Sequence, residues 1–227
     1  MAYGAARRFR NLAVAAIFVG SAAGANAEAV TLAALGDSLT QGYGLPPEDG
    51  LVPQLQAWLA ARGHEVTVLN AGVSGDTTAG GLSRTDWTLT PEVDALMVAL
   101  GGNDMLRGID PAEVRANLTG ILEKAAAKGV PVLLVPIAAP GNYGPDYKRD
   151  FEATYPDLAA EFGALLAGDM FAPLIAARDA GTPMDDLMQA DGIHRSAAGA
   201  KLVAAGLGPK SEALLDRVEE VRARPKD

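Results

Sequence analysis

The sequence predicts a three-layer α/β/α domain with a mainly parallel central sheet. Short apolar runs alternate along the chain with segments of helical periodicity, and such alternation is typical of strands joined by right-handed crossover helices. Helices on both faces bury the strands of a parallel sheet. With 227 residues, of which 49% are hydrophobic and 21% charged, the chain can bury the core that this architecture needs.

The strands are predicted from four apolar runs, each short enough to be a buried strand. These runs are residues 30–35, 65–69, 93–100 and 130–137. Apolar runs of four to eight residues, bounded by turn residues, are typical of strands that are covered on both faces.

The most clearly marked helix is predicted at residues 111–128. Its apolar side chains recur at helical spacing on one face: Val114, Leu118, Ile121, Leu122 and Ala125. Asp110 is a suitable N-cap, and Pro111 fits the first helical turn. Gly129 follows the last apolar position and ends the helix.

Further helices are predicted at residues 50–62, at 147–162 with a bend at Pro156, and at 197–207, with a separate last helix before the tail. The sequence contains no internal repeat and no linker long enough to divide it. We therefore expect residues 28–227 to form a single domain.

The first 27 residues have the pattern of a signal peptide. The positive charges of this segment are Arg7, Arg8 and Arg10. An apolar run at residues 12–19 follows, and Ala25-Asn26-Ala27 matches a signal-peptidase site. The alternative is an uncleaved anchor, for which the apolar run is short. Cleavage after Ala27 would leave an exported chain, periplasmic or secreted, without a stable membrane anchor; the export route, Sec or twin-arginine, stays open.

Composition excludes several classes of function. Cleavage removes three of the 19 Lys and Arg residues and none of the 28 Asp and Glu residues, so the net charge changes from −9 to −12. An acidic protein repels phosphate backbones, which argues against nucleic-acid binding. Without cysteine there is no thiolate nucleophile, and two histidines leave little room for a metal site. We expect no metal, no cofactor and a monomer.

Glycine-rich polar segments follow the predicted strands, and a similar one lies late in the chain. They are Gly36-Asp37-Ser38-Leu39, Asn70 to Asp76, Gly101-Gly102-Asn103-Asp104 and Asp191-Gly192-Ile193-His194. The ligand site of an open α/β sheet lies beyond the carboxyl ends of its strands. Taken singly, each segment has an ordinary explanation: a serine after a strand is usually a helix cap, and His194 fits a capping or surface residue.

Together these segments contain the groups of a serine nucleophile site. Ser38 needs a base, and the imidazole of His194 is a suitable one. Asp191 lies three positions before His194, and Gly192 permits a tight turn that would bring the carboxylate to the ring. Backbone N–H groups of Ser38 and Gly75 and the side-chain amide of Asn103 are candidate donors to an oxyanion.

These blocks occur in the order found in the SGNH (GDSL) hydrolases, and the chain resembles that family over nearly the whole predicted mature sequence. The longer sequence motifs around these blocks are GGNDMLRG at residues 101–108 and DGIH at 191–194, among others. They are similar to those of the periplasmic acyl-CoA thioesterase I, lysophospholipase L1 and arylesterase group. The resemblance implies a flavodoxin-like sheet, with Ser38 as nucleophile, His194 as base and acid, and Asp191 as its partner.

The same resemblance implies that Gly75 and Asn103 join Ser38 in an oxyanion hole. It also implies a mobile, substrate-sensing loop at residues 105–110, which makes Met105 and Leu106 candidate substrate contacts. One departure is Arg195, which stands where many members have proline directly after the histidine. We expect it to change how the loop is held and to add a positive charge near the mouth.

Other polar and aromatic residues are expected to be structural. These are His64, Trp58, Asp37, Asp104, Asp185 and Asp186. Asp37 and Asp104 are expected to hold loops through backbone hydrogen bonds, and Trp58 is expected in the core. Tyr143, in a glycine-rich loop after the fourth strand, is a candidate wall of an acyl pocket.

The predicted function is hydrolysis of carboxylic esters and thioesters through an acyl-enzyme. Aryl esters, short- to medium-chain acyl esters, acyl thioesters and lysophospholipids are the substrates considered. One alternative is a glycan O-acetyl esterase that uses the same catalytic chemistry. The other is a catalytically silent lipid- or glycan-binding protein with the same fold. A complete triad with three oxyanion donors favours an enzyme.

Overall fold

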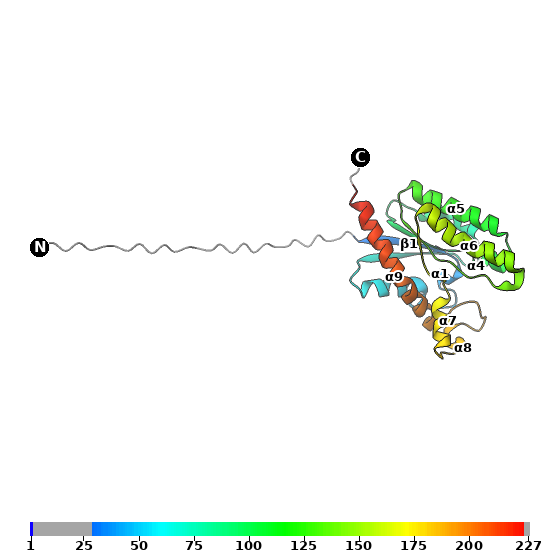
Figure 1. Ribbon diagram of the computed structural model, residues 1–227. Coiled ribbons are helices and arrows are strands. Elements are labelled where there is room, and N and C mark those ends of the chain that lie inside the picture. The colour runs from blue at the N-terminus through cyan, green and yellow to red at the C-terminus, as the bar shows by residue number, and fades with distance from the viewer. Residues whose placement is uncertain (2–28, 225–227) are drawn as a thin grey trace.

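The computed structural model describes residue 1 and residues 29–224 (Figure 1). Apart from Met1, the predicted signal peptide lies outside the described residues. Among the described residues, no helix has the length and apolar character needed to cross a membrane.

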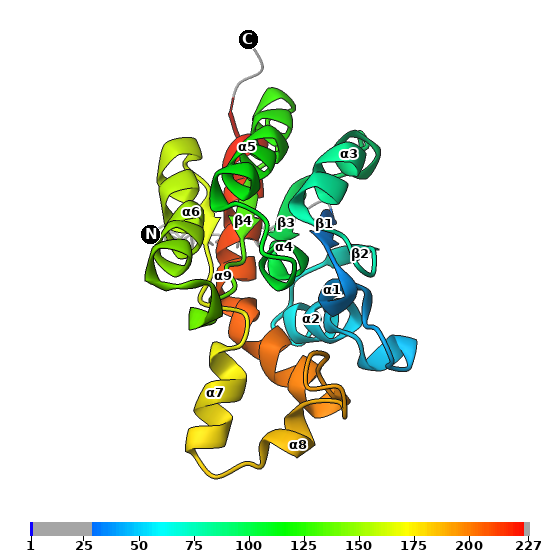
Figure 2. The same cartoon turned by 90° about the vertical axis from the view of Figure 1, so that its right-hand side faces the viewer.

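The centre of the molecule is a parallel sheet of five strands. The strands are β1 (Val30–Gly36), β2 (Val66–Gly72), β3 (Ala95–Ala99), β4 (Val132–Leu134) and β5 (Leu165–Leu166). Their order in the sheet is β2-β1-β3-β4-β5, and every neighbouring pair is parallel. Figure 2 shows β4, β3, β1 and β2 in succession from left to right. The predicted parallel sheet is confirmed, in the flavodoxin-like order.

Two strands differ from their prediction. The predicted strand at residues 130–137 is only three residues long, because Pro131 and Pro136 near its ends have no N–H for the sheet ladder. The two-residue strand β5 was not predicted, since Leu165–Leu166 is too short for any periodicity to show.

Helices cover both faces of the sheet, as Figure 2 shows. One face packs against α2 (Leu51–Ala60), α7 (Ala172–Asp179), α8 (Met184–Leu187) and α9 (Ala197–Arg222). The other packs against α3 (Thr78–Thr88), α5 (Pro111–Ala127) and α6 (Pro145–Phe162). Alternate residues of β1 enter the two cores, Leu32 and Ala34 on the first face and Ala33 and Leu35 on the second.

The C-terminal part of the chain corrects the prediction of two separate helices. α9 is one helix of 26 residues that continues through Pro209. Its buried side chains keep helical spacing on both sides of the proline: Val203, Leu207, Leu214 and Val218. Proline removes a hydrogen bond from a helix interior, but continuous burial of this face against the sheet outweighs that loss.

One helix was not predicted and one side chain was misplaced, because tertiary packing decides both. α3 was not predicted, since its buried positions are Thr78, Gly81 and Thr85 instead of an apolar stripe. Trp58, expected in the core, is only partly buried: it packs against the core and carries the guanidinium of Arg62 at 3.4 Å from its ring centroid.

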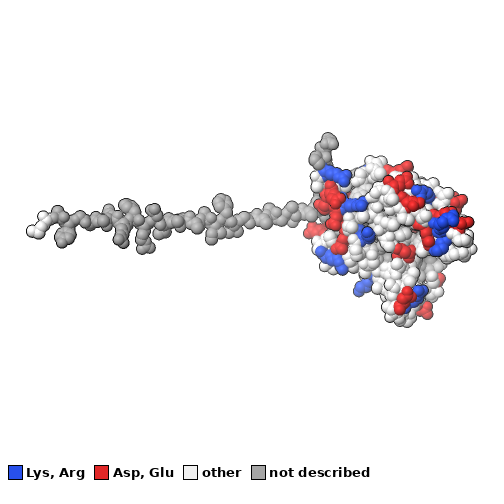
Figure 3. Space-filling view, in the orientation of Figure 1, with Lys and Arg blue, Asp and Glu red and all other residues white. Residues whose placement is uncertain are grey.

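The surface carries both signs of charge. On the face drawn in Figure 3, acidic and basic side chains are intermixed over the folded part of the chain. Exposed ion pairs on α5 and α6 are of this kind, such as Arg115 with Asp157 at 3.2 Å.

The strand order determines where a site can form. β1 lies between β2 and β3, so the segments that follow these three strands emerge side by side at one edge of the sheet. The chain leaves β1 toward β2 and later adds β3 on the opposite side, which makes the β1–β3 boundary a topological switch point. Two short helices begin at this edge, α1 (Ser38–Gln41) after β1 and α4 (Gly102–Leu106) after β3.

Candidate active site

The sharp turn from β1 into α1 presents Ser38. Asp37 caps α1 by accepting a hydrogen bond from the N–H of Leu39 at 2.9 Å, and Ser38 is the first residue of the helix. A Cβ at Gly36 would lie 2.0 Å from Oγ1 of Thr40, so only glycine lets α1 fold back this closely onto the strand end. Ser38 is 8% exposed and lines a cavity.

Asp191 and His194 are joined by the tight turn that Gly192 was predicted to allow. Gly192 has a φ of +66°, in the left-handed region. Asp191 accepts hydrogen bonds through Oδ1 from the N–H groups of Ile193 and His194, each at 2.9 Å. Its Oδ2 lies 2.6 Å from Nδ1 of His194. The bond to the imidazole, followed by the two backbone bonds, lowers the pKa of Asp191 to about 2.

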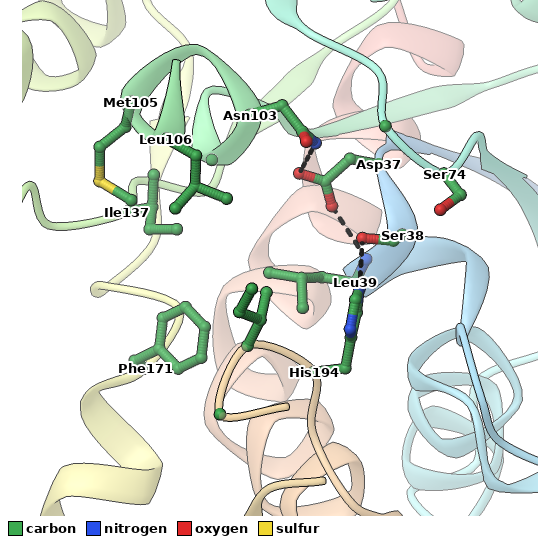
Figure 4. A pocket seen from close by; sticks show the side chains of 14 residues that line it. Asp37, Ser38, Leu39, Ser74, Asn103, Met105, Leu106, Ile137, Phe171 and His194 are labelled. Atoms are coloured by element: carbon green, nitrogen blue, oxygen red, sulfur yellow. Dashed lines mark hydrogen bonds between the residues drawn. The ribbon is translucent and has the colours of Figure 1, made fainter. Parts of the chain in front are cut away.

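Ser38, His194 and Asp191 form a continuous hydrogen-bonded chain. Nε2 of His194 lies 2.9 Å from Oγ of Ser38, although the two residues are 156 positions apart (Figure 4). The ring of Tyr43 packs on the imidazole, with 4.4 Å between the centroids. With Nδ1 facing the carboxylate, the ring's Nε2 is directed at the hydroxyl as a proton acceptor.

The three expected oxyanion donors differ in their state. Within the described part of the chain, the N–H groups of Ser38 and Gly75 make no hydrogen bond. The side-chain amide of Asn103 donates to the carbonyl of Asp76 at 2.9 Å and to Oδ2 of Asp37 at 3.3 Å. The side-chain amide of Asn103 therefore already makes two hydrogen bonds at the cavity. The bond to Asp37 is the longer and weaker of the two, so it is the one that a ligand oxygen could replace more easily.

Arg84 fixes the backbone around these donors. Its guanidinium donates to the carbonyls of Gly36 at 2.8 Å and Ala71 at 2.7 Å, which lie at the ends of β1 and β2. It also pairs with Asp76 at 2.6 Å, directly after Gly75. One planar side chain thus ties the turn that carries Ser38 to the turn that contains Gly75.

Asp37 and Asp104 hold loops, as expected. Burial raises the pKa of Asp37, which caps α1. Asp104 is fully buried and accepts hydrogen bonds from Thr78, from its N–H at 2.9 Å and from its hydroxyl at 2.6 Å. This contact fixes the start of α3 beside α4.

An apolar cavity of about 330 Å³ opens beside Ser38. Figure 4 shows Ser38 and His194 at one end, with Met105, Leu106, Ile137 and Phe171 on the opposite wall. Met105 and Leu106 were predicted to contact substrate, and both line the cavity. Leu39, Ile137, Phe171 and Ile193 also line the cavity and were not predicted as substrate contacts. Leu39 and Ile193 lie inside the glycine-rich segments that were expected at the site, and Ile137 ends a predicted strand. Phe171 had no signal in the sequence.

Tyr143 does not line this cavity, contrary to the prediction. Its hydroxyl donates to the carbonyl of Leu106 at 3.3 Å, and its ring packs 5.0 Å from that of Tyr147. These contacts direct the side chain at the back of the segment that carries Met105 and Leu106, so it supports the wall from outside.

Arg195 also differs from its expectation. It adds no charge at the mouth: the residue is only 3% exposed, and its guanidinium donates to the carbonyl of Leu39 beneath α1. The other histidine, His64, pairs with Glu212 of α9 at 3.0 Å, which agrees with a structural role. Among the described residues, no group of three or more His, Asp or Glu side chains is arranged to hold a metal ion.

The sequence is similar to those of known proteins. Residues 34–202 match the model of the GDSL-like lipase/acylhydrolase family. The chain is 40% identical over 190 residues to the esterase TesA of Pseudomonas aeruginosa, covering 83% of this chain and 91% of that protein. It is 39% identical over 141 residues to the thioesterase 1/protease 1/lysophospholipase L1 of Escherichia coli, covering 60% of this chain and 64% of that protein.

A solved structure has the same fold. The psychrotrophic esterase EstA from Pseudoalteromonas sp., in a structure inhibited by monoethylphosphonate, aligns with a TM-score of 0.73 and 30% identity, covering 82% of this chain and 98% of that one. With the family model matched over most of the described residues, the chain belongs to the GDSL-like lipase/acylhydrolase family.

Proposed function

We propose that this protein is a serine esterase that hydrolyses carboxylic esters and thioesters, with Ser38, His194 and Asp191 as its catalytic residues. The observation that carries the proposal is the hydrogen-bonded chain from Asp191 through His194 to Ser38 at the end of an apolar cavity. The names of the relatives, an esterase and a thioesterase/lysophospholipase, support the same reaction class.

In the first half of the reaction, Ser38 becomes acylated. Oγ of Ser38 attacks the carbonyl carbon while its proton passes to Nε2 of His194. Asp191 holds Nδ1–H and stabilises the imidazolium. The negative charge that develops on the carbonyl oxygen is bound by the N–H groups of Ser38 and Gly75 and by the amide of Asn103, which exchanges its bond to Asp37 for one to the oxyanion.

Collapse of the tetrahedral intermediate breaks the bond to the leaving oxygen or sulfur. The leaving group takes the proton from His194 and departs as an alcohol, phenol or thiol. Water then attacks the acyl-enzyme, with His194 as the base, and releases the carboxylic acid. Ser38 regains its proton, and no cofactor is consumed.

The cavity wall suits an acyl chain as the part of the substrate that is held. Leu39, Ile137 and Phe171 face the space beyond Ser38 and offer apolar contacts to each methylene of such a chain. Acetyl groups on glycans would leave most of this wall unused. We therefore propose short- to medium-chain acyl esters and thioesters, in preference to glycan acetates, as the substrates.

We also propose that residues 1–27 direct export and are cleaved after Ala27, leaving a monomer in the periplasm. The support is the charge and apolar pattern of that segment. Expression in a Gram-negative host is expected to give a periplasmic protein whose first residue is Glu28. N-terminal sequencing checks the cleavage site, and size-exclusion chromatography with light scattering checks that the protein is a monomer. An intact N-terminus or a cytoplasmic product would contradict export.

Replacing Ser38 tests the nucleophile. Ser38→Ala is expected to lower kcat on p-nitrophenyl esters by several orders of magnitude and to abolish labelling by a fluorophosphonate. Asn103→Ala is expected to cost roughly 10²- to 10³-fold in kcat, since it removes one oxyanion donor. Ester hydrolysis at the wild-type rate in purified, folded Ser38→Ala would refute the mechanism.

The low pKa of Asp191 predicts a pH dependence of stability. Its folded pKa of about 2 lies below the ordinary 3.8, so the ionised carboxylate stabilises the fold above pH ~4, and this contribution is lost as pH falls toward 2. The difference in Tm between wild type and Asp191→Asn is therefore expected to shrink over that interval. Asp191→Asn should also lower kcat by roughly 10³- to 10⁴-fold. A Tm difference that is constant from pH 5 to pH 2 would contradict this role.

Narrowing the cavity tests its use for acyl chains. Ile137→Phe replaces an aliphatic side chain with a bulkier aromatic ring in the wall between Met105 and Phe171. Each buried methylene contributes about 0.8 kcal/mol, so kcat/KM on p-nitrophenyl octanoate is expected to fall at least about 10-fold. The acetate ester should keep its rate within about 2-fold, because it does not reach this wall. Equal losses on both esters would argue against an acyl pocket here.

A further inference from the structure

Arg195 is buried although it carries a charge. It follows His194 directly and is 3% exposed. Burial lowers its pKa to about 10, which reports the cost of taking the guanidinium out of water. Arginine is rarely this buried unless other groups compensate. The groups that surround it therefore indicate what the side chain does.

Its guanidinium is placed beneath the nucleophile. It donates to the carbonyl of Leu39, the residue directly after Ser38. The N–H of the same Leu39 donates to the carboxylate of Asp37 at 2.9 Å. Leu39 is thus held through both its N–H and its carbonyl by two buried groups of opposite charge, Asp37 being 4% exposed. The positive charge of Arg195 opposes the rise that burial causes in the pKa of Asp37.

The backbone of Arg195 belongs to the turn that carries His194. Arg195 pairs with Met188 in an isolated antiparallel bridge. Its carbonyl accepts a hydrogen bond at 2.9 Å from Nε2 of Gln189, and that nitrogen also donates to the carbonyl of Tyr43 at 2.8 Å. The N–H of Tyr43 in turn donates to the carbonyl of Ser38 at 3.1 Å. Gln189 is therefore a second tie between the two segments.

We propose that Arg195 is a positioning residue that sets the alignment of Ser38 with His194 by tying α1 to the base-bearing turn. The proposal rests on the proposed function for the roles of Ser38 and His194. α1 has only four residues and little stability of its own, so its contacts fix the direction of the serine hydroxyl. A displacement of about 1 Å between reacting groups costs on the order of 10²-fold in rate.

The test compares three variants. Arg195→Met keeps the length of the side chain and removes charge and donors; Arg195→Lys keeps the charge and loses the planar fork. Arg178→Met is the control, an exposed arginine on α7. The readouts are kcat and KM on p-nitrophenyl acetate, the rate of fluorophosphonate labelling of Ser38, and Tm.

Arg195→Met is expected to lower kcat and the labelling rate together by roughly 10- to 100-fold, with KM within about 2-fold of wild type. Arg195→Lys should restore part of the loss, and Arg178→Met should match wild type. If Arg195→Met does not fold, Gln189→Met tests the second tie and is expected to lower kcat by a smaller factor at unchanged KM.

Three results would overturn the proposal. They are wild-type kcat and labelling in folded Arg195→Met, a change confined to KM, and a loss of activity that follows the unfolded fraction alone. If Arg195→Met does not fold, wild-type kcat in folded Gln189→Met overturns it as well. A wild-type protein that hydrolyses no ester and reacts with no fluorophosphonate would instead refute the proposed function, which makes the two failures distinguishable.

Discussion

The position of β1 between β2 and β3 is the constraint on which the rest of the site depends. Because β1 is hydrogen-bonded on both sides, its end lies about 5 Å from the end of each neighbour, and the ends of β2 and β3 lie about 10 Å apart. The turn that carries Ser38, the turn that contains Gly75 and α4 each begin at one of these ends. Arg84 then binds the carbonyls of Gly36 and Ala71, so the spacing of the first two turns is set twice, by the sheet ladder and by one side chain.

Charge is distributed unevenly around the hydroxyl of Ser38. Asp191 is exposed and its ionised form is stabilised by three hydrogen bonds, whereas Asp37 is buried and its ionised form is disfavoured by burial. The first carboxylate faces the imidazole and the second caps α1, with Arg195 as the nearby opposite charge. In the proposed mechanism, Asp191 is thus matched to the imidazolium that develops, whereas Asp37 is matched to the backbone and Asn103.

The candidate site could be predicted from the sequence because its signals are local. Gly36-Asp37-Ser38 and Asp191-Gly192-Ile193-His194 contain their turn residues and chemical groups within four positions, and the structure joins them as expected. Strands β1 to β3 and helix α5 were also readable from apolar spacing. The positions of the Arg195 and Tyr143 side chains could not be predicted, because each depends on which residues of a distant segment pack beside it. α3 was missed for a related reason, since its buried positions carry no apolar stripe and packing keeps it helical. α9 was predicted as two helices, and burial of one face that continues past Pro209 joins them.

The 156-residue separation between Ser38 and His194 affects the order in which the site forms during synthesis and folding. Ser38 is synthesised early, and His194, its proposed base, only near the end, just before the helix that closes one face of the sheet. Until that last segment docks, Ser38 has no proton acceptor at its side and is no more reactive than any serine on a loop. Under the proposed mechanism, ester hydrolysis therefore begins only when the fold is complete, and a chain truncated before His194 lacks the base.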